Sequence, residues 1–243
     1  MIPLERRETC YGTVTIFRRK LTGALVYDLS GSPQSEADQS GISLASYVHA
    51  IYDFLLQNDA RSVLMIGCGG GTLGTMLVRV ARKVAIVDVN PDAFDLAKRY
   101  FGLPLSIACH LADGRDYLVA HSERYDAIVL DAFHGDHVPA HLRTLAFLRL
   151  VFARLKHRGM FLANVHVKDD ADRTPDQVAQ AAANIWQDVR LLDATGYCNR
   201  NAIVAAGNVQ RLRKPALRLR PNESVNEIAH ELNTSHFRPW RVL

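Results

Sequence analysis

The stretch from residue 63 to residue 88 constrains the fold of this chain more than any other. A hydrophobic run ends in a glycine-rich loop, a helical pattern follows, and a second hydrophobic run ends at Asp88. That order is typical of a nucleotide-binding β-α-β unit, in which glycines allow a sharp turn and close approach of the backbone to a ligand. Asp88 lies 21 residues after Gly67, where a carboxylate can accept both ribose hydroxyls. The pattern therefore predicts a nucleoside site.

Two further carboxylates follow predicted strands. Asp113 comes just after a third hydrophobic run and precedes Gly114, and Asp131 ends a fourth run that begins at Tyr125. In an open parallel sheet the carboxyl ends of the strands line one crevice, which is the usual ligand site. Asp88, Asp113 and Asp131 are therefore predicted to share one site. The alternative is that all three begin helices, because Asp is a common N-cap residue.

Composition narrows the class of protein. A chain of 243 residues, 48% of them hydrophobic, can bury one sizeable core plus a small appendage. The net charge of +4 favours nucleic-acid binding only if the basic residues gather in a patch. The basic cluster at 211–220 includes arginines that alternate with leucines, which predicts an edge strand with a solvated, charged face instead. We therefore expect no nucleic-acid partner.

Cysteine usage and hydropathy indicate a cytoplasmic protein. The four cysteines are scattered without a CxxC spacing, which suggests reduced thiols. The N-terminal residues do not have the pattern of a signal peptide, and no apolar run approaches the roughly 18 residues that a membrane span needs. We expect a soluble protein with no membrane partner.

The expected fold class is α/β, with a mostly parallel sheet, helices on both faces and a small β-hairpin in front. The apolar patterns predict strands at 12–17, 24–29, 160–165, 189–192 and 202–206, a loop at 31–41, and helices marked by apolar residues within 44–55, 73–81, 91–101, 142–155 and 178–189. We expect three parts: the hairpin and a substrate loop at 1–42, a cofactor-binding domain at 43–207, and a basic extension packed on that domain at 208–243.

These features resemble the spermidine synthase (polyamine aminopropyltransferase) family. The order is a front hairpin, Gln34 in a polar loop, Tyr47 on a helix, the glycine loop, Val-Asp-Val-Asn-Pro, the Asp-Gly pair and Tyr-Asp-x-Ile-x-x-Asp. The similarity runs from about residue 11 to residue 165. It is closest to a divergent branch in which the fourth strand is followed by Asp-Ala-Phe, a short polar loop and Pro-x-His-Leu, as at residues 131–142 here. It implies a Rossmann-like class I methyltransferase fold, a homodimer, and aminopropyl transfer from decarboxylated S-adenosylmethionine to a diamine such as putrescine.

The resemblance also implies roles for single residues. Asp88 is expected to hold the ribose hydroxyls, Asp113 the adenine amino group and Gln34 the tail of the cofactor. Tyr47 is expected to border the acceptor pocket. The full set of expected cofactor contacts is Gln34, Gly67, Gly69, Gly70, Gly71, Asp88, Val89, Asp113, Gly114 and Asp131. The expected catalytic residues are Tyr47, Asp131, His134 and Asp136.

Two positions depart from the family pattern. The loop of active members carries an aspartate that holds the cofactor's ammonium, and Gly70 stands there; the second carboxylate of their Asp-x-x-Asp is replaced by His134. An alkylamine has a pKa of about 10 and arrives protonated, so the site must attract a cation and take its proton. Neutral His134 can take the proton but offers no anionic attraction. Asp136 is the predicted substitute for the missing carboxylate.

The histidines after the fourth predicted strand have a second interpretation. The spacing of His134, His137 and His141 permits a metal site together with Asp131. A solvated loop followed by a helix start is the simpler explanation, and no metal is expected.

Three functions therefore stay open. Aminopropyl transfer, with methylthioadenosine as the product, is favoured by the extended resemblance. Methyl transfer from S-adenosylmethionine to a small acceptor, with S-adenosylhomocysteine as the product, is favoured by Gly70, because the site then has less reason to prefer a decarboxylated cofactor. Non-catalytic binding of an adenosyl ligand is favoured by the missing base.

Overall fold

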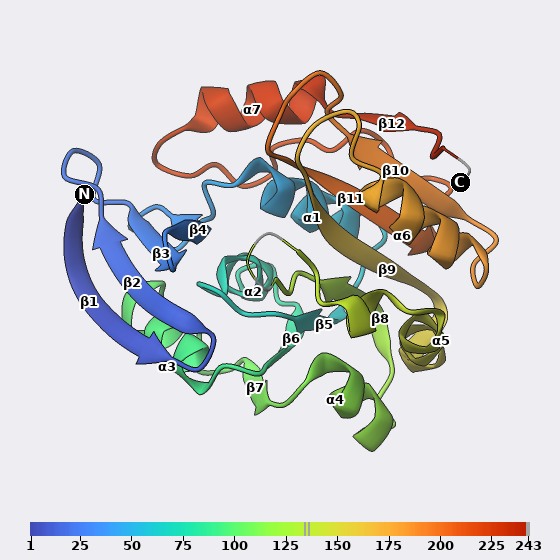
Figure 1. Ribbon diagram of the computed structural model, residues 1–243, viewed down its shortest axis with the longest axis horizontal. Coiled ribbons are helices and arrows are strands. Elements are labelled where there is room, and N and C mark those ends of the chain that lie inside the picture. Colours follow the sequence, from blue (N-terminus) through green and yellow to red (C-terminus); the bar gives the residue numbers. More distant parts are fainter. Residues whose placement is uncertain (134, 136, 242–243) are drawn as a thin grey trace.

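The computed structural model describes residues 1–133, 135 and 137–241. It contains a four-stranded antiparallel sheet at the N-terminus and an eight-stranded sheet with helices on both faces (Figure 1). This architecture confirms the predicted Rossmann-like α/β class. Within the described residues, no helix has the length and apolar character needed to cross a membrane.

The N-terminal sheet is larger than the predicted hairpin. Its strands follow chain order, each antiparallel to the next: β1 (Ile2–Thr9), β2 (Gly12–Arg18), β3 (Leu25–Leu29) and β4 (Ser32–Ala37). The two expected strands correspond to β2 and β3. The prediction of a loop at 31–41 was wrong for β4, which has the polar sequence SPQSEA. β4 forms by pairing with β3 across a tight turn at Ser30 and Gly31, and hydrophobic alternation plays no part.

The large sheet has the order β12-β10-β11-β9-β8-β5-β6-β7. Its strands are β5 (Ser62–Ile66), β6 (Lys83–Asp88), β7 (Ala108–Leu111), β8 (Tyr125–Leu130), β9 (Leu155–Val167), β10 (Val189–Asp193), β11 (Arg200–Gly207) and β12 (His236–Arg238). The strands from β9 to β7 run parallel, and the remaining three add antiparallel pairs. β5 lies between β6 and β8, so the strand order reverses there. Ligands bind at such a switch point, beyond the carboxyl ends of the strands.

Helices cover both faces of this sheet: α1 (Ser46–Gln57), α2 (Thr72–Val78), α3 (Pro91–Tyr100), α4 (Gly114–Ala120), α5 (Leu145–Arg154), α6 (Thr174–Ala183) and α7 (Val225–Thr234). One apolar cluster holds α1, α2, α3 and α7, and a second holds α4, α5 and α6. Alternate residues of β5 enter the two clusters, Val63 and Met65 the first and Leu64 and Ile66 the second. This two-sided core fixes the carboxyl ends of β5, β6 and β8.

Three helices are shorter than predicted. α2 ends at Val78, and Ala81 turns away with a φ of 55°. The segment 142–155 divides into a 3-10 turn (Ala140–Arg143), α5 and the first residue of β9. α6 ends at Ala183, and Val189 belongs to β10. Past α5 and α6 the apolar pattern continues because Leu155 and Val189 of the following strands pack into the same cluster, whereas Val80 and Ala81 past α2 are exposed.

The predicted edge strand near 217–220 was wrong. The segment is irregular and lies against α1, where Arg218 Nε donates to Asp53 Oδ1 at 2.6 Å and Ala216 N donates to Asp53 Oδ2 at 2.9 Å. The Asp53 side chain is fully buried. Arg218 therefore neutralises a buried carboxylate, which is costly to leave unpaired.

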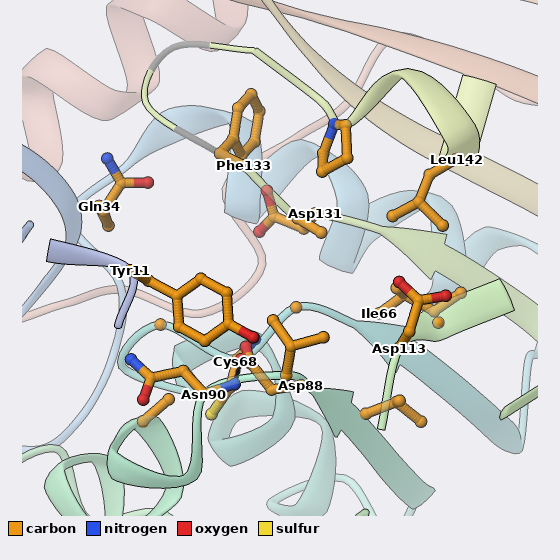
Figure 2. A pocket seen from close by; sticks show the side chains of 18 of the residues that line it. Tyr11, Gln34, Ile66, Cys68, Asp88, Asn90, Asp113, Asp131, Phe133 and Leu142 are labelled. Atoms are coloured by element: carbon orange, nitrogen blue, oxygen red, sulfur yellow. Dashed lines mark hydrogen bonds between the residues drawn. The ribbon is translucent and has the colours of Figure 1, made fainter. Parts of the chain in front are cut away.

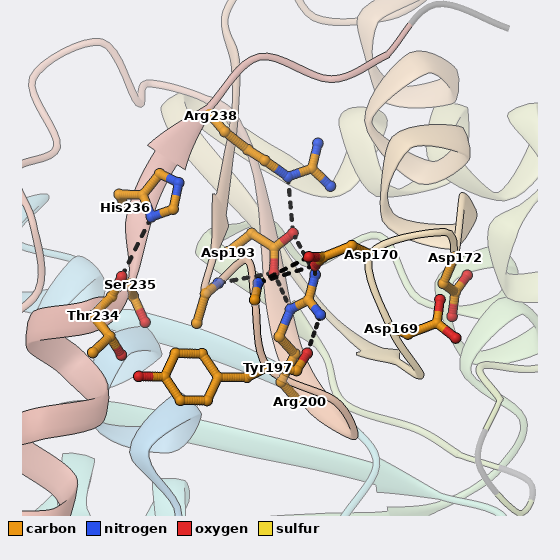
Figure 3. Close-up of polar contacts among 12 residues, drawn as sticks. Asp169, Asp170, Asp172, Asp193, Tyr197, Arg200, Thr234, Ser235, His236 and Arg238 are labelled. Atoms are coloured by element: carbon orange, nitrogen blue, oxygen red, sulfur yellow. Dashed lines mark hydrogen bonds and ion pairs between the residues drawn. The ribbon is translucent and has the colours of Figure 1, made fainter.

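Ion pairs hold the last described residues on the edge of the large sheet. β12 pairs with β10, and Arg238 Nε donates to Asp193 Oδ2 at 2.8 Å (Figure 3). Arg238 Nη1 also donates to Asp176 Oδ1 at 2.8 Å, and Arg241 Nη2 donates to Asp176 Oδ2 at 2.9 Å. Both carboxylate side chains are fully buried.

The boundaries between the three expected parts of the chain, at residues 42 and 207, remain predictions.

Candidate active site

A cavity of about 410 Å³ lies at the carboxyl ends of β5, β6 and β8, with further walls from the N-terminal sheet (Figure 2). The residues predicted from the sequence that line it are Gln34, Tyr47, Gly67, Gly69, Asp88, Val89, Asp113, Gly114 and Asp131. The three aspartates at strand ends thus meet in one place. Gly70 and Gly71 do not belong to the cavity wall, so the geometry does not support their predicted contact with the cofactor.

Contacts within the protein shape the part of the glycine loop that lines the cavity. Gly67 has a φ of 105°, and a Cβ there would run into the carbonyl oxygen of Asp131. Gly69 has a φ of 50°, and a Cβ there would lie 2.6 Å from Ser35 Oγ. The sequence predicts that these glycines allow the close approach of a ligand. The structure adds that no side chain fits at positions 67 and 69, where the loop approaches Asp131 and Ser35.

Gly70 and Gly71 face the core. A Cβ at Gly70 would lie 2.8 Å from Phe101 Cδ1, and one at Gly71 would lie 2.5 Å from Leu103 Cδ1. Phe101 is 1% exposed, so its ring has little room to move. Ser35 Oγ accepts a hydrogen bond from Gly70 N at 3.0 Å. An aromatic ring therefore fills the space into which a side chain at Gly70 would extend.

Asp88 ends β6 and connects two loops. Its Oδ2 accepts a hydrogen bond from Cys68 N at 2.7 Å, and its Oδ1 accepts one from Asn90 N at 2.7 Å. Burial raises the pKa of Asp88, while these backbone donors act to lower it. Each carboxylate oxygen keeps a further lone pair, so the group can still accept from ligand hydroxyls.

Asp113 combines the two roles that the sequence left as alternatives. It is the N-cap of α4, where Oδ1 accepts from Arg115 N and Asp116 N, and it also lines the cavity. Its Oδ2 lies 2.8 Å from His141 Nε2. Partial burial acts to raise the pKa of Asp113, but the hydrogen bonds from His141 and the two backbone donors hold it below its usual value. Gly114 next to it packs directly against Ile66, where a Cβ would collide.

Asp131 follows β8 and faces the cavity with a chain of polar partners behind it. Its Oδ1 accepts from Asn164 Nδ2 at 2.8 Å, and its Oδ2 accepts from the Tyr47 hydroxyl at 3.4 Å. Asn164 Oδ1 in turn accepts from Asn201 Nδ2 at 2.9 Å. Burial raises the pKa of Asp131, and burial beside this carboxylate raises the pKa of Tyr47. Tyr47 therefore stays protonated and can act as a donor.

Two of the predicted catalytic residues, His134 and Asp136, lie outside the described residues. His141, which the sequence analysis considered as a metal ligand, bonds to Asp113. Across residues 1–133, 135 and 137–241, no three His, Cys, Asp or Glu side chains gather in a geometry that could hold a metal ion.

Several wall residues were missed by the sequence analysis, among them Tyr11, Ser35 and Leu142. Asn164, which holds Asp131 from behind, was also missed, although it leaves a signal: a polar residue in the middle of the apolar run 160–165. Ser35 leaves none, because it stands in a stretch that is polar throughout. Gln34 lines the cavity as predicted, with Nε2 3.2 Å from Ser32 Oγ.

The chain is similar in sequence both to methyltransferases and to polyamine aminopropyltransferases. Residues 63–159 match the family described as "Methyltransferase domain". The chain is 34% identical over 126 residues to the polyamine aminopropyltransferase of Vibrio vulnificus, and 30% identical over 132 residues to a probable polyamine aminopropyl transferase of Bifidobacterium longum. It is also 33% identical over 128 residues to the eEF1A lysine and N-terminal methyltransferase of Danio rerio. These alignments cover 49%, 54% and 46% of this chain.

The crystal structure of a probable spermidine synthase from Corynebacterium glutamicum superposes with a TM-score of 0.78 at 16% identity. That superposition covers 97% of this chain and 90% of the other. The chain therefore has the class I methyltransferase fold, and parts of its sequence are similar to polyamine aminopropyltransferases. It spans 42%, 30% and 18% of the length of the Vibrio, Bifidobacterium and Danio relatives.

Proposed function

We propose that the protein is a transferase that moves the aminopropyl group of decarboxylated S-adenosylmethionine to a diamine such as putrescine. The observation that carries the proposal is Asp131, a partly buried carboxylate bonded to Tyr47 on the wall of the cavity whose other side holds Asp88 (Figure 2). The similarity to polyamine aminopropyltransferases supports the choice of group.

The residues beyond β6 and β7 fit an adenosyl group. Asp88 offers ribose hydroxyls a carboxylate whose orientation is fixed by the amides of Cys68 and Asn90. Asp113 is held by His141 and by the first turn of α4, and the remaining lone pair of Oδ2 can accept from an adenine amino group. The ligand supplies a carbon activated by a sulfonium, and the protein needs only to position it and to prepare the acceptor.

Asp131 would prepare the acceptor amine. The amine arrives as a cation, and a partly buried carboxylate attracts it more strongly than a fully exposed one would. The raised pKa of Asp131 also makes it a better proton acceptor than an ordinary aspartate. Asn164 and Tyr47 hold the two carboxylate oxygens from the protein side, which fixes the direction in which the remaining lone pairs point.

Methyl transfer from intact S-adenosylmethionine is the second candidate. It is favoured by the contact between Gly70 and Phe101, because the buried ring occupies the direction in which the family's ammonium-binding aspartate would leave the backbone. Without that carboxylate the site loses its electrostatic reason to select a decarboxylated donor. The match to a methyltransferase domain supports this candidate as well.

A paired transfer assay separates the candidates. Purified protein would be incubated with putrescine and either decarboxylated or intact S-adenosylmethionine, and the products would be measured by mass spectrometry. Spermidine with methylthioadenosine is the expected result. A methylated amine with S-adenosylhomocysteine, and no spermidine, would replace the first candidate by the second.

Asp131→Asn provides the test of the catalytic group. It should lower kcat by about 10²-fold or more, the usual range for losing a positioned proton acceptor. Asp126→Asn is a matched control, because Asp126 lies on β8, the strand that Asp131 follows, but outside the cavity wall, where it bonds to Ser62. Equal turnover in the two variants would rule out Asp131 as the base.

A further inference from the structure

The turn between β1 and β2 carries an aromatic side chain to the cavity. Tyr11 belongs to the wall although it comes from the N-terminal sheet (Figure 2). It is 36% exposed, so part of its surface is free to cover a ligand in the cavity. Burial, the adjacent Cys10 thiol and the carboxylates of Asp88 and Asp113 raise the pKa of its hydroxyl. The hydroxyl thus stays protonated on the wall of the cavity that Asp88 and Asp113 also line.

The conformation of this turn is fixed locally. Thr9 Oγ1 donates to Gly12 O at 2.8 Å and accepts from Tyr11 N at 3.1 Å. Gly12 has a φ of 123°, and a Cβ there would run into Ser30 Oγ. Tyr11 is therefore held at the tip of a defined turn.

Ion pairs fix β1 to the helix that starts beside Asp88. Arg7 donates to Glu5 at 2.5 Å, to Asp92 at 2.9 Å and to Asp95 at 2.5 Å. Glu5 also accepts from the Tyr100 hydroxyl at 2.7 Å. The Arg7 side chain is 22% exposed and the Glu5 side chain 19%, so solvent screens these pairs less than it screens surface pairs.

These contacts of Arg7 and Glu5 with α3 form a clamp, and its position on α3 affects the site. Asp92, Asp95 and Tyr100 all lie on α3, whose N-cap Asn90 donates its backbone N–H to Asp88 Oδ1 at 2.7 Å. The clamp therefore ties strand β1 to the same helix start that orients the Asp88 carboxylate. Helix α3 therefore positions both Asp88 in the cavity wall and the turn that carries Tyr11.

We propose that Tyr11 is a ligand-binding residue that covers the adenosyl nucleoside, and that Arg7 positions it by clamping β1 to α3. The ring becomes more buried and stacks by lying on the nucleoside. This contact does not depend on which group is attached to the sulfur. The hydroxyl donates toward the polar edge of the ligand. This inference rests on the proposed function only for the adenosyl group and is independent of which group is transferred.

Binding of methylthioadenosine and of S-adenosylhomocysteine tests the inference without turnover. Tyr11→Ala should raise the Kd of both ligands about 5-fold to 100-fold, the range for losing one aromatic stacking partner of a base. The rise should come from faster dissociation, measured by stopped-flow displacement, and Tyr11→Phe should restore most of the affinity. Tyr197→Ala is the matched control, since Tyr197 is also exposed and lies outside the cavity wall.

The positioning role of Arg7 has its own variant. Arg7→Met should raise the Kd in the same direction, whereas Arg6→Met on the same strand should not, because the Arg6 side chain is 70% exposed and pairs with Glu8. The effects of Tyr11→Ala and Arg7→Met on the Kd should be less than additive, since both act through the contact between Tyr11 and the nucleoside. Unfolding temperatures without ligand should stay unchanged for Tyr11→Ala.

The outcomes separate this inference from the proposed function. Tight binding by the wild type with an unchanged Kd in Tyr11→Ala would overturn the ligand role of Tyr11 and leave the proposed function standing. Additive effects would overturn the positioning role of Arg7. Failure of the wild type to bind either ligand would overturn both the inference and the adenosyl site.

Discussion

Replacing Gly70 by alanine tests the close packing of Phe101 against the glycine loop. The backbone of Gly70 does not have a positive φ, so the substitution adds a methyl group without adding backbone strain. That methyl carbon would lie 2.8 Å from Cδ1, 3.0 Å from Cγ and 3.1 Å from Cε1 of Phe101. Separations this short force the ring to move. The ring is buried with Tyr27 as an aromatic neighbour, centroid to centroid 6.4 Å.

The expected loss of stability follows from this overlap. Overpacking of a closely packed core typically destabilises by about 1–3 kcal/mol. For a domain of this size, each kcal/mol lowers Tm by about 2–4 °C. Gly70→Ala should therefore lower Tm by about 2–12 °C.

A double-mutant cycle identifies Phe101 as the cause. Phe101→Leu removes ring atoms next to Gly70, so the combined variant should be more stable than the sum of the two single effects by about 0.5–3 kcal/mol. Differential scanning calorimetry and urea unfolding would measure it. A Tm for Gly70→Ala equal to that of the wild type, or full additivity with Phe101→Leu, would refute the argument.

The same contact governs any attempt to restore the family's carboxylate. Gly70→Asp places a larger and charged side chain against the buried ring, so in the wild-type background it should destabilise the protein further. In the Phe101→Leu background the aspartate has room to reorient. An increase in affinity for decarboxylated over intact S-adenosylmethionine is expected there alone, and calorimetric titration of both donors would measure it.

Three further expectations concern single carboxylates. Asp88→Ala should weaken methylthioadenosine binding by about 1.5–3 kcal/mol, the value of hydrogen bonds to a charged group, and unchanged affinity would exclude Asp88 from the ribose site. Because burial raises the pKa of Asp131 and a base works deprotonated, kcat/KM should rise with pH above the usual aspartate range, and Asp131→Asn should abolish that limb. Burial acts to raise the pKa of Asp176, but Arg238 and Arg241 hold it far below its usual value. Its contribution to stability is therefore present above the unfolded pKa and lost on acidification, so urea midpoints of Asp176→Asn should fall less between pH 7 and pH 3 than those of the wild type, and equal slopes would contradict this.

Local sequence determined the framework of the site. The glycine loop between two hydrophobic runs, and aspartates at the ends of three runs, predicted the β5-α2-β6 unit and the meeting of Asp88, Asp113 and Asp131. These predictions succeeded because strand periodicity, turn glycines and the parallel arrangement of strand ends are properties of short segments and of the fold class. Strands β2, β3, β5, β6 and β8–β11 also followed from these signals, whereas β1, β4, β12 and α7 did not.

Tertiary packing decided the rest. The polar strand β4 exists through its pairing with β3, and Arg218 lies where it does because Asp53 is buried on α1. Phe101 behind Gly70 and Tyr11 over the cavity come from positions that are distant in sequence from the glycine loop and from Asp88. No local pattern encodes such partners, because the free energy of these contacts depends on which surfaces the folded sheet brings together.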